Sequence, residues 1–148
     1  MFGSRKEDFL YRTVYLLDDS APDNILHERL LKQTQFAKNV HVFTDSDACL
    51  AHLTYLSSNS EQDLTHLLPE IICLDLNMPF RNGWYFIERF AELTAKLPVP
   101  SRIVVLSHVS DPEEIQRLES HPNVALFLPK PLSKDHLYKL KNRIPQRR

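Results

Sequence analysis

The segment Ile71-Ile-Cys-Leu-Asp-Leu-Asn-Met-Pro79 decides the fold, because it contains a short apolar strand that ends at a single acidic residue. Residues 71–74 show no alternation of apolar and polar side chains, which is typical of a strand covered on both faces. Asp75 follows directly, and Gly83 ends the turn that leads into a helical pattern. The apolar face of that helix is expected at Ile87, Phe90, Ala91 and Leu97. Strand, acidic residue, turn and helix form one unit.

Four more apolar runs repeat this unit along the chain. The expected strands are Thr13–Leu17, Asn39–Phe43, Ile103–Leu106 and Val124–Leu128. Capping residues mark the helices between and after them, at Ser20, at Asp45 or Ser46, at Asp111 and at Ser133. The helix after Ser20 is expected to have its apolar face at Ile25, Leu26, Leu30 and Leu31, and the helix after Asp45 or Ser46 at Ala48, Ala51 and Tyr55. The helix after Ser133 is expected to have it at Leu137, Leu140 and Ile144. The alternation predicts an α/β fold, a parallel sheet with helices on both faces.

The composition excludes several classes of protein. The 148 residues are 43% apolar and 25% charged with a net charge of −1, which is typical of one globular domain and gives no basic surface for nucleic acid. Two distant glycines cannot build a phosphate-binding glycine loop. Cys49 and Cys73 make neither a CxxC site nor a disulfide framework. The longest apolar run, Val124–Leu128, is too short to span a membrane, and residues 1–12 lack the apolar core of a secretory signal, so a cytoplasmic protein is expected.

Polar residues follow the strands at the points where each strand ends. In open parallel sheets the working site lies beyond the carboxyl ends of the strands. The residues there are Asp18, Asp19, Asp75, Ser107 and Lys130. Carboxylates crowded together disfavour one another's ionised forms, and a hard divalent cation such as Mg²⁺ relieves that repulsion through oxygen ligands. The lysine and the serine complete a pocket suited to an anionic tetrahedral group bonded to an aspartate.

At this point the chain resembles a known family, the receiver domain of two-component response regulators. The resemblance rests on Leu74–Pro79, on Gly83-Trp84, on Ser107 and on Lys130-Pro131, and it covers about Thr13 to Ile144. It implies a flavodoxin-like (βα)₅ fold with the doubly wound strand order 2-1-3-4-5. It also implies an N-terminal extension at 1–12, a receiver domain at 13–144 and a tail at 145–148, without an output domain, as in stand-alone regulators of the chemotaxis type.

The resemblance assigns the acceptor and its metal. Asp75 stands where receivers carry the phosphoryl acceptor, which takes its group from the phosphohistidine of a sensor histidine kinase or a histidine phosphotransfer protein. The Asp19 position contacts Mg²⁺ directly, and the Asp18 position mainly through water. Asp75 itself and the backbone carbonyl at Asn77 supply further oxygen ligands. Mg²⁺ is therefore the expected cofactor.

The resemblance also implies a set of switching residues. Lys130 would pair with Asp75 or with phosphoryl oxygens, and Ser107 would donate a hydrogen bond to the phosphoryl group. Phe127 stands where receivers carry a rotating aromatic side chain. The peptide bond before Pro131 is expected to be cis, an arrangement essentially confined to proline.

Two departures from the family pattern leave alternatives open. His108 stands where a small residue usually follows the switch hydroxyl, and Pro129 precedes Lys130. One alternative is a receiver-shaped interaction module that takes no phosphate, which His108 favours weakly. The other is an aspartate-nucleophile phosphatase, but that class needs a second carboxylate two residues after the nucleophile, where this chain has Asn77. A signalling receiver rather than an enzyme is expected.

Overall fold

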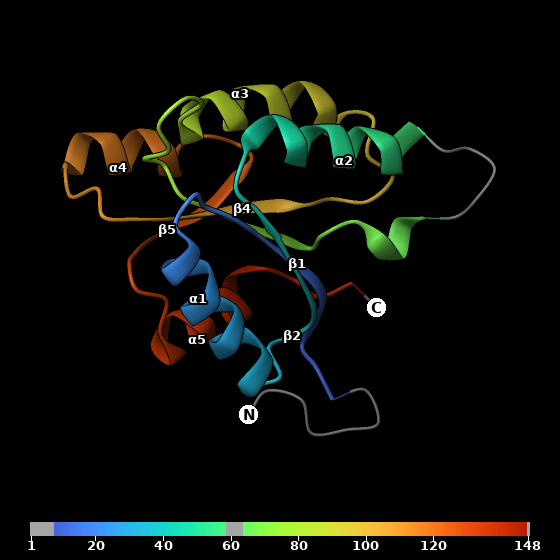
Figure 1. The fold of residues 1–148 in the computed structure, drawn as a ribbon, viewed down its shortest axis with the longest axis horizontal. Coiled ribbons are helices and arrows are strands. Elements are labelled where there is room, and N and C mark those ends of the chain that lie inside the picture. Colours follow the sequence, from blue (N-terminus) through green and yellow to red (C-terminus); the bar gives the residue numbers. More distant parts are fainter. Residues whose placement is uncertain (1–7, 59–63, 148) are drawn as a thin grey trace.

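The structure is a computed structural model of the chain, and it describes residues 8–58 and 64–147. One sheet of five parallel strands runs in the order β2-β1-β3-β4-β5 (Figure 1). The strands are β1 (Tyr11–Leu17), β2 (Ala37–Phe43), β3 (Ile71–Leu74), β4 (Arg102–Ser107) and β5 (Val124–Pro129). The predicted α/β class, the flavodoxin-like fold and the strand order are confirmed.

The helices cover both faces of this sheet. They are α1 (Ala21–Gln33), α2 (Ser46–Ser58), α3 (Gly83–Thr94), α4 (Pro112–Glu119) and α5 (Lys134–Arg143), with one 3-10 turn at Thr65–Leu67. Helices α1 and α5 lie on one face, and α2, α3 and α4 lie on the other (Figure 1). The predicted caps at Ser20, Asp111 and Ser133 are confirmed, because each side chain accepts a hydrogen bond from a backbone N–H of the first turn.

Gly83 begins α3, and the space around it admits no side chain. A Cβ atom there would lie 2.8 Å from the Cα of Leu76 and 3.1 Å from the carbonyl oxygen of Asp75. The N–H of Gly83 donates to the carbonyl of Leu76 at 2.8 Å, and the side chain of Asn82 accepts from the N–H of Tyr85. This close approach holds the start of α3 against the segment that carries Asp75.

The core has two layers, one on each side of the sheet. Under α2, α3 and α4, the rings of Phe86 and Phe90 stack with their centroids 5.7 Å apart. Under α1 and α5, the rings of Tyr11 and Phe36 lie 4.9 Å apart. The Tyr11 hydroxyl donates to the carbonyl of Ile144 at 2.5 Å, which ties the end of α5 to β1. Apolar side chains therefore fill both faces of the sheet, and the ends of the strands are the place where a functional site can form.

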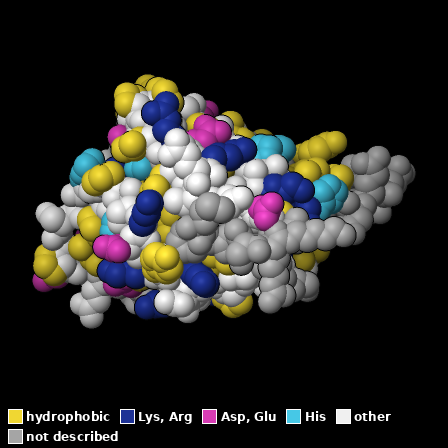
Figure 2. Space-filling view, turned by 90° about the horizontal axis from the view of Figure 1, so that it is seen from below, with side chains coloured by type: hydrophobic (Ala, Val, Ile, Leu, Met, Phe, Trp, Pro, Cys, Tyr) yellow, Lys and Arg dark blue, Asp and Glu magenta, His cyan; other side chains and the backbone are white. Residues whose placement is uncertain are grey.

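The inner face of α1 differs from the one expected. Ile25 and Leu26 are 56% and 51% exposed, whereas Asn24, His27 and Leu31 are buried against the sheet. Figure 2 views the molecule from the side of α1 and α5, where hydrophobic side chains lie scattered among charged ones. The prediction was wrong for Ile25 and Leu26, whereas Leu31 is buried and Leu30 packs against the core as expected. Asn24 and His27 lie on the inner side with Leu31 because they hydrogen-bond to Asp18 and Leu132.

The inner faces of α2 and α3 also need correction. In α2 the expected Ala48, Ala51 and Tyr55 are exposed, and the buried residues are Ser46, Cys49, Leu53 and Leu56. In α3, Ile87 and Phe90 are buried as expected, but Ala91 is exposed and Leu97 lies beyond the end of the helix. Larger apolar side chains displace alanine from the sheet contact because they bury more surface.

The chain ends are partly integrated into the sheet. Tyr11 and Arg12, counted in the sequence as extension, belong to β1, and Tyr11 pairs with Ala37 of β2. Residues 1–7 and 148 lie outside the described residues. Near the C-terminus, the backbone N–H of Arg147 donates to the Glu70 carboxylate at 2.7 Å. No helix within the described part of the chain is both long and apolar enough to cross a membrane.

Candidate functional site

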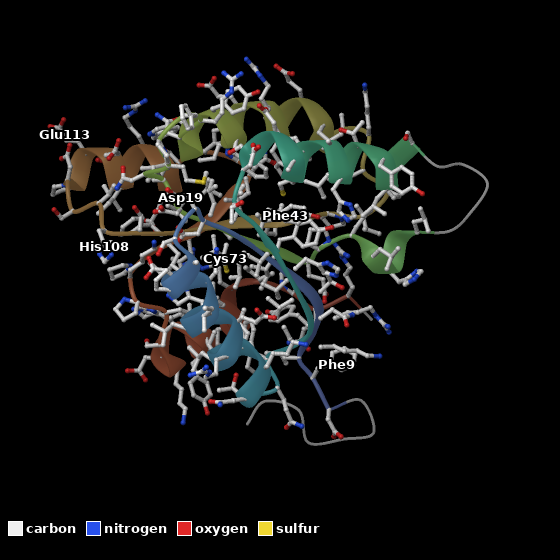
Figure 3. All side chains as sticks on the ribbon, in the orientation of Figure 1. Phe9, Asp19, Phe43, Cys73, His108 and Glu113 are labelled. Atoms are coloured by element: carbon white, nitrogen blue, oxygen red, sulfur yellow. The ribbon has the colours of Figure 1, made fainter. Side chains whose placement is uncertain are left out.

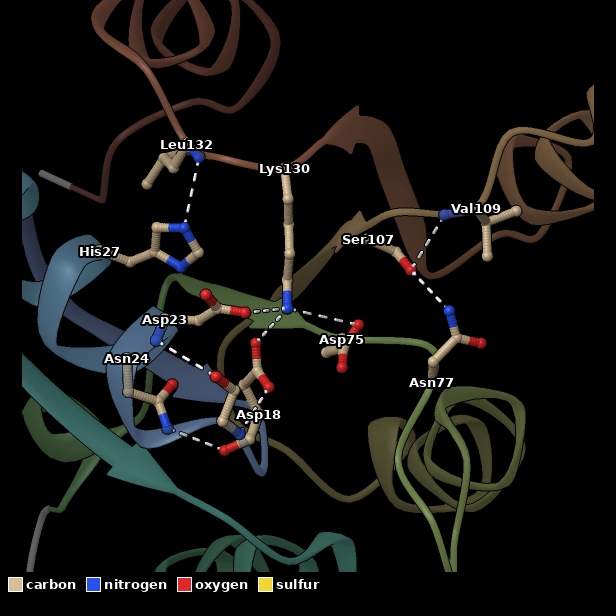
Figure 4. Close-up of polar contacts among 11 residues, drawn as sticks. Asp18, Asp23, Asn24, His27, Asp75, Asn77, Ser107, Val109, Lys130 and Leu132 are labelled. Atoms are coloured by element: carbon tan, nitrogen blue, oxygen red, sulfur yellow. Dashed lines mark hydrogen bonds and ion pairs between the residues drawn. The ribbon is translucent and has the colours of Figure 1, made fainter.

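The carboxyl edge of the sheet brings the expected site residues together. Asp18 follows β1, Asp75 follows β3, Ser107 ends β4 and Lys130 follows β5 (Figure 4). Carboxylate oxygens of Asp18, Asp19 and Asp75 all lie within 4.8 Å of one another. Asp18 and Asp75 are buried, whereas Asp19 is exposed at the rim (Figure 3). The arrangement is an acidic pocket with one side open to solvent.

Hydrogen bonds from α1 and the neighbouring strands fix Asp18. Its N–H donates to the carbonyl of Phe43 at 3.0 Å. Its Oδ1 accepts from the N–H of Ser20 at 2.9 Å, and its carbonyl accepts from Nδ2 of Asn24 at 2.8 Å. Asp75 is fixed from the same strand, because its N–H donates to the carbonyl of Leu17 at 2.9 Å. The two buried carboxylates are thus set by backbone geometry.

Lys130 reaches into the pocket as a buried cation, with a side chain only 5% exposed. Its Nζ lies 2.6 Å from Oδ2 of Asp18 and 2.8 Å from Oδ2 of Asp23, but 3.7 Å from Oδ1 of Asp75 (Figure 4). The first two distances are hydrogen bonds and the third is an ion pair without one. The expected pairing of Lys130 with Asp75 is therefore present as a longer contact, and Asp18 and Asp23 hold the ammonium.

The crowding changes the proton affinities of these groups. Burial raises the pKa of Asp75, and the Asp18 carboxylate raises it further, while Lys130 and a backbone hydrogen bond from Asn77 oppose the rise. Burial alone would lower the pKa of Lys130, but its hydrogen bonds to Asp18 and Asp23 outweigh burial and raise it. The ammonium stays charged, and the Asp75 carboxylate is more basic than an exposed aspartate. A basic carboxylate oxygen is a better nucleophile.

Ser107 faces the pocket from the end of β4. Its Oγ accepts long hydrogen bonds from Nδ2 of Asn77 at 3.5 Å and from the N–H of Val109 at 3.4 Å (Figure 4). Its hydroxyl proton is free to point elsewhere, because both contacts use the oxygen as an acceptor. Ser107 can therefore donate to a group bonded to Asp75.

Three further positions singled out in the sequence lie on β5 or just beyond the ends of β4 and β5. The Lys130-Pro131 peptide bond is cis, as predicted. Phe127 on β5 is half-buried, and its N–H donates to Oε2 of Glu119 at 3.2 Å. The exposed His108 follows Ser107 at the rim (Figure 3). The cis bond was expected, whereas the switching role of Phe127 and the effect of His108 stay predictions.

The sequence analysis missed three polar residues of α1 that touch the site. Asp23 binds the Lys130 ammonium, Asn24 binds the backbone of Asp18, and Nε2 of His27 accepts from the N–H of Leu132 at 3.3 Å. Burial lowers the pKa of His27, which favours the neutral form needed to accept that bond. The helical spacing of Asn24 and His27, continued by Leu31, was the available signal.

The donor set suits a magnesium ion. Mg²⁺ binds oxygen ligands, commonly one or two carboxylates with several waters. Asp18, Asp19 and Asp75 offer carboxylate oxygens close enough to share one ion, and the exposed side at Asp19 leaves room for waters. The ammonium of Lys130 contacts Asp75 only at 3.7 Å and is shared with Asp18 and Asp23, so the protein balances the charge of these carboxylates only in part. The residues present therefore fit the expected metal, with the Asn77 carbonyl as the further ligand that the resemblance implies.

Comparisons with known proteins give structural matches only, since no protein-family model and no curated protein matches the sequence. A two component response regulator from Cytophaga hutchinsonii is 28% identical with a TM-score of 0.78, covering 89% of this chain and 95% of that chain. A response regulator receiver protein from Dyadobacter fermentans is 28% identical with a TM-score of 0.72, covering 88% and 96%.

A more distant likeness shows the fold alone. The receiver domain of the histidine kinase CKI1 from Arabidopsis thaliana, crystallised with Mg²⁺ and BeF₃⁻, is 18% identical with a TM-score of 0.72, covering 93% of this chain and 90% of that chain. The two bacterial regulators and this plant domain share one architecture with the present chain. The resemblance to response-regulator receiver domains, first indicated by the strand-end residues, is confirmed over most of the chain.

Proposed function

We propose that this chain is a phosphoacceptor receiver of two-component signalling. In this proposal Asp75 takes a phosphoryl group from the phosphohistidine of a sensor histidine kinase or a histidine phosphotransfer protein. The observation that carries the proposal is the pocket itself. A buried Asp75 carboxylate lies beside two further carboxylates and within 3.7 Å of a buried ammonium. Solved receivers of similar fold and sequence support it.

The proposed transfer follows from the chemistry of Asp75. One carboxylate oxygen attacks the phosphorus of the phosphohistidine, an O–P bond forms and the P–N bond breaks. The electron pair of that bond remains on the imidazole nitrogen of the partner. The product is an acyl phosphate on Asp75. Such a transfer asks the protein mainly for positioning and charge neutralisation, and Lys130 supplies both a fixed place and a positive charge.

Mg²⁺ fits the carboxylates described above and would supply positive charge opposite the phosphoryl oxygens. Asp18 and Asp19 would hold it, together with Asp75. The partner approaches from the open side, where a cavity of about 470 Å³ lies between the loops that follow β2 and β3. Asp19, Met78 and the 96% exposed Phe80 stand along this approach.

Switching in this proposal begins at Ser107. Its hydroxyl turns toward the phosphoryl oxygens and gives up the long contacts to Asn77 and Val109, which are weak at 3.5 and 3.4 Å. The half-buried Phe127 then has space to move inward behind Ser107. These two movements carry the phosphorylation state to the surface formed by α4, β5 and α5.

Two alternatives are less well supported. A phosphatase would need an acid or base two residues after the nucleophile, and the side chain there is the exposed amide of Asn77, which contacts Ser107. A module that takes no phosphate would not need the acidic cluster or the buried lysine. No enzyme activity is therefore proposed, nor any direct contact with nucleic acid or membrane. The cytoplasmic location stays a prediction.

The experiment is phosphorylation by a small donor with mass spectrometry as the readout. Incubation with Mg²⁺ and acetyl phosphate should add the mass of one phosphoryl group to the intact chain. Asp75→Asn should show no such addition, because an amide lacks the nucleophilic oxygen, and Asp135→Asn, at an exposed position on α5, serves as a matched control that keeps it. Label retained in Asp75→Asn would refute the acceptor assignment, and steady release of phosphate without a labelled chain would favour the phosphatase.

A further inference from the structure

The ammonium of Lys130 is divided unequally among three carboxylates. An ammonium has three donors. Two of them are used at hydrogen-bond distance, by Asp18 at 2.6 Å and by Asp23 at 2.8 Å, whereas Asp75 lies at 3.7 Å. Figure 4 shows the lysine descending between α1 and β3, with Asp23 on the side away from Asp75. The acceptor carboxylate is thus the most weakly bound of the three.

Asp23 is well placed to stay ionised and fixed. It lies in the first turn of α1, where the positive end of the helix dipole favours a carboxylate. Its own N–H donates to Oγ of the capping Ser20 at 3.3 Å. The hydrogen bond from Lys130 lowers the pKa of Asp23. Its side chain is one-third exposed, so water can solvate the carboxylate after the lysine leaves.

The same helix also holds the chain that carries the lysine. Nε2 of the buried His27 accepts from the N–H of Leu132, two residues beyond Lys130. Asn24 binds the carbonyl of Asp18 on the opposite side of the pocket. Helix α1 therefore contacts both the backbone that follows β5 and the backbone that follows β1, and Asp23 projects from it between the two.

We propose that Asp23 is a positioning residue, which holds the Lys130 ammonium away from Asp75 until a phosphoryl group on Asp75 competes for it. This inference rests on the proposed function, because the competing group is the acyl phosphate. A phosphoryl group brings oxygen acceptors and additional negative charge, so it attracts the ammonium more strongly than the bare carboxylate does. Asp18 stays bound to the lysine, and the contact to Asp23 is the one that breaks.

Removing the Asp23 carboxylate should have two effects on the resting pocket. A neutral amide oxygen at position 23 attracts the ammonium less strongly than a carboxylate does, so Lys130 can move toward Asp75. One negative charge also disappears from the neighbourhood that an anionic phosphodonor must enter. Both effects favour phosphorylation.

The test compares Asp23→Asn with wild type and two matched variants. Phosphorylation by acetyl phosphate with Mg²⁺ should be roughly two- to fivefold faster in Asp23→Asn. This factor corresponds to the interaction energy of a part-exposed charge pair. Asp135→Asn removes a carboxylate from the first turn of α5 that is not among the ion-pair partners of the lysine, and it should keep the wild-type rate. Asp23→Glu keeps the charge and should return the rate toward wild type.

A crystal structure of Asp23→Asn gives a readout that does not depend on labelling. The distance from Nζ of Lys130 to Oδ1 of Asp75 should fall from 3.7 Å to hydrogen-bond length. If wild type and all variants remain unlabelled, the proposed function fails, and the crystal distance alone decides whether Asp23 positions the lysine. If wild type is labelled, equal rates in Asp23→Asn and Asp135→Asn with an unchanged distance would overturn the inference.

Discussion

The two edges of the sheet both bury charged groups, but these groups are paired differently at the two edges. At the amino edge, the carboxylate of Glu70 accepts from the N–H groups of Arg12 and Arg147, each at 2.7 Å. The guanidinium of Arg147 donates in turn to the carbonyls of Leu68 at 2.9 Å and Pro69 at 2.6 Å. Both oxygens of the buried acid accept a hydrogen bond, although Nε of Arg147 is buried without a partner.

At the carboxyl edge, one ammonium is shared by three carboxylates, and a further carboxylate at Asp19 stands beside them. The pKa of Asp75 is raised by burial and by its acidic neighbour, so this edge carries negative charge that the protein balances only in part. A buried carboxylate with both oxygens hydrogen-bonded stabilises a fold, whereas negative charge that is only partly balanced favours the binding of a cation. Substitutions at the two edges should therefore differ, with loss of stability at the amino edge and changes in binding and labelling at the carboxyl edge.

The largest effect is expected at the amino edge. Glu70→Ala should lower the free energy of unfolding by about 3 kcal/mol, because two part-buried backbone N–H donors lose a charged acceptor. Urea unfolding followed by circular dichroism measures the loss. Glu70→Gln, which keeps one carbonyl oxygen, should lose about half as much. Acetyl phosphate labelling of the folded Glu70→Ala variant should be unchanged, and a slower labelling would show that the two edges are not independent.

The second effect concerns the metal. Asp19→Ala should weaken Mg²⁺ binding about tenfold from an affinity of about 1 mM, because the site is only partly made by the protein and loses one of its oxygen ligands. Isothermal titration calorimetry measures the change. Asp45→Asn, an exposed carboxylate outside the cluster, is the control for general charge and should bind as wild type does. An unchanged titration of Asp19→Ala would contradict the acidic-pocket argument.

The third effect is a gain of stability at the carboxyl edge. The pKa of Asp75 is raised in the folded state, so the folded protein binds more protons than the unfolded chain does between the two pKa values. Stability is therefore lost as the pH rises through that window, and the loss remains at neutral pH. Asp75→Asn removes the charge and should raise Tm at pH 7 by roughly 3 °C, the effect of about 1 kcal/mol.

The pH dependence separates this explanation from a packing effect. Well below the usual pKa of an aspartate, Asp75 is protonated in both states, and the gain from Asp75→Asn should disappear. Thermal unfolding of both proteins across acidic and neutral pH makes the comparison. A variant that is less stable than wild type at pH 7 would mean that the carboxylate is balanced within the protein, as Glu70 is.

The place of the candidate site at the carboxyl edge of the sheet could be predicted from the sequence, for a topological reason. Asp18, Asp75, Ser107 and Lys130 each follow an apolar strand, and parallel strands place their carboxyl ends at one edge. No contact between side chains had to be known. The same reasoning predicted the strand order only through the family resemblance, since periodicity does not say which strands are neighbours.

The contacts of α1 and of the amino edge are not determined by the apolar periodicity of the sequence. Helix α1 has apolar residues at Ile25 and Leu26 and polar ones at Asn24 and His27, and the polar pair is the one buried, with hydrogen bonds to Asp18 and Leu132. The network at the amino edge joins residues 77 positions apart at Glu70 and Arg147. A single charged residue near a chain end carries no pattern that would reveal its partner.

The smallest effect is expected at the rim, where His108 follows Ser107. This exposed imidazole stands where receivers usually carry a small residue, so it should obstruct both an entering phosphodonor and the water that hydrolyses the acyl phosphate. Lys130, and Mg²⁺ where it is bound, would already supply positive charge to the phosphoryl group, so the steric effect should outweigh any attraction of anions. His108→Ala should therefore speed labelling and shorten the phosphoryl half-life, each by roughly twofold, as suits an exposed side chain.

Paired decay measurements with excess Mg²⁺ test this last prediction. The neighbouring Val109 has no side-chain hydrogen-bonding group to orient a hydrolytic water, so wild type should lose its label slowly. Ser110→Ala, at an exposed position two residues further along the loop, is the matched control and should leave both rates as they are in wild type. If the label of His108→Ala decays at the wild-type rate, the histidine lies in solvent without limiting access to the phosphoryl group. The part of the carboxyl edge that is closed to solvent is then confined to Asp75, Ser107 and Lys130.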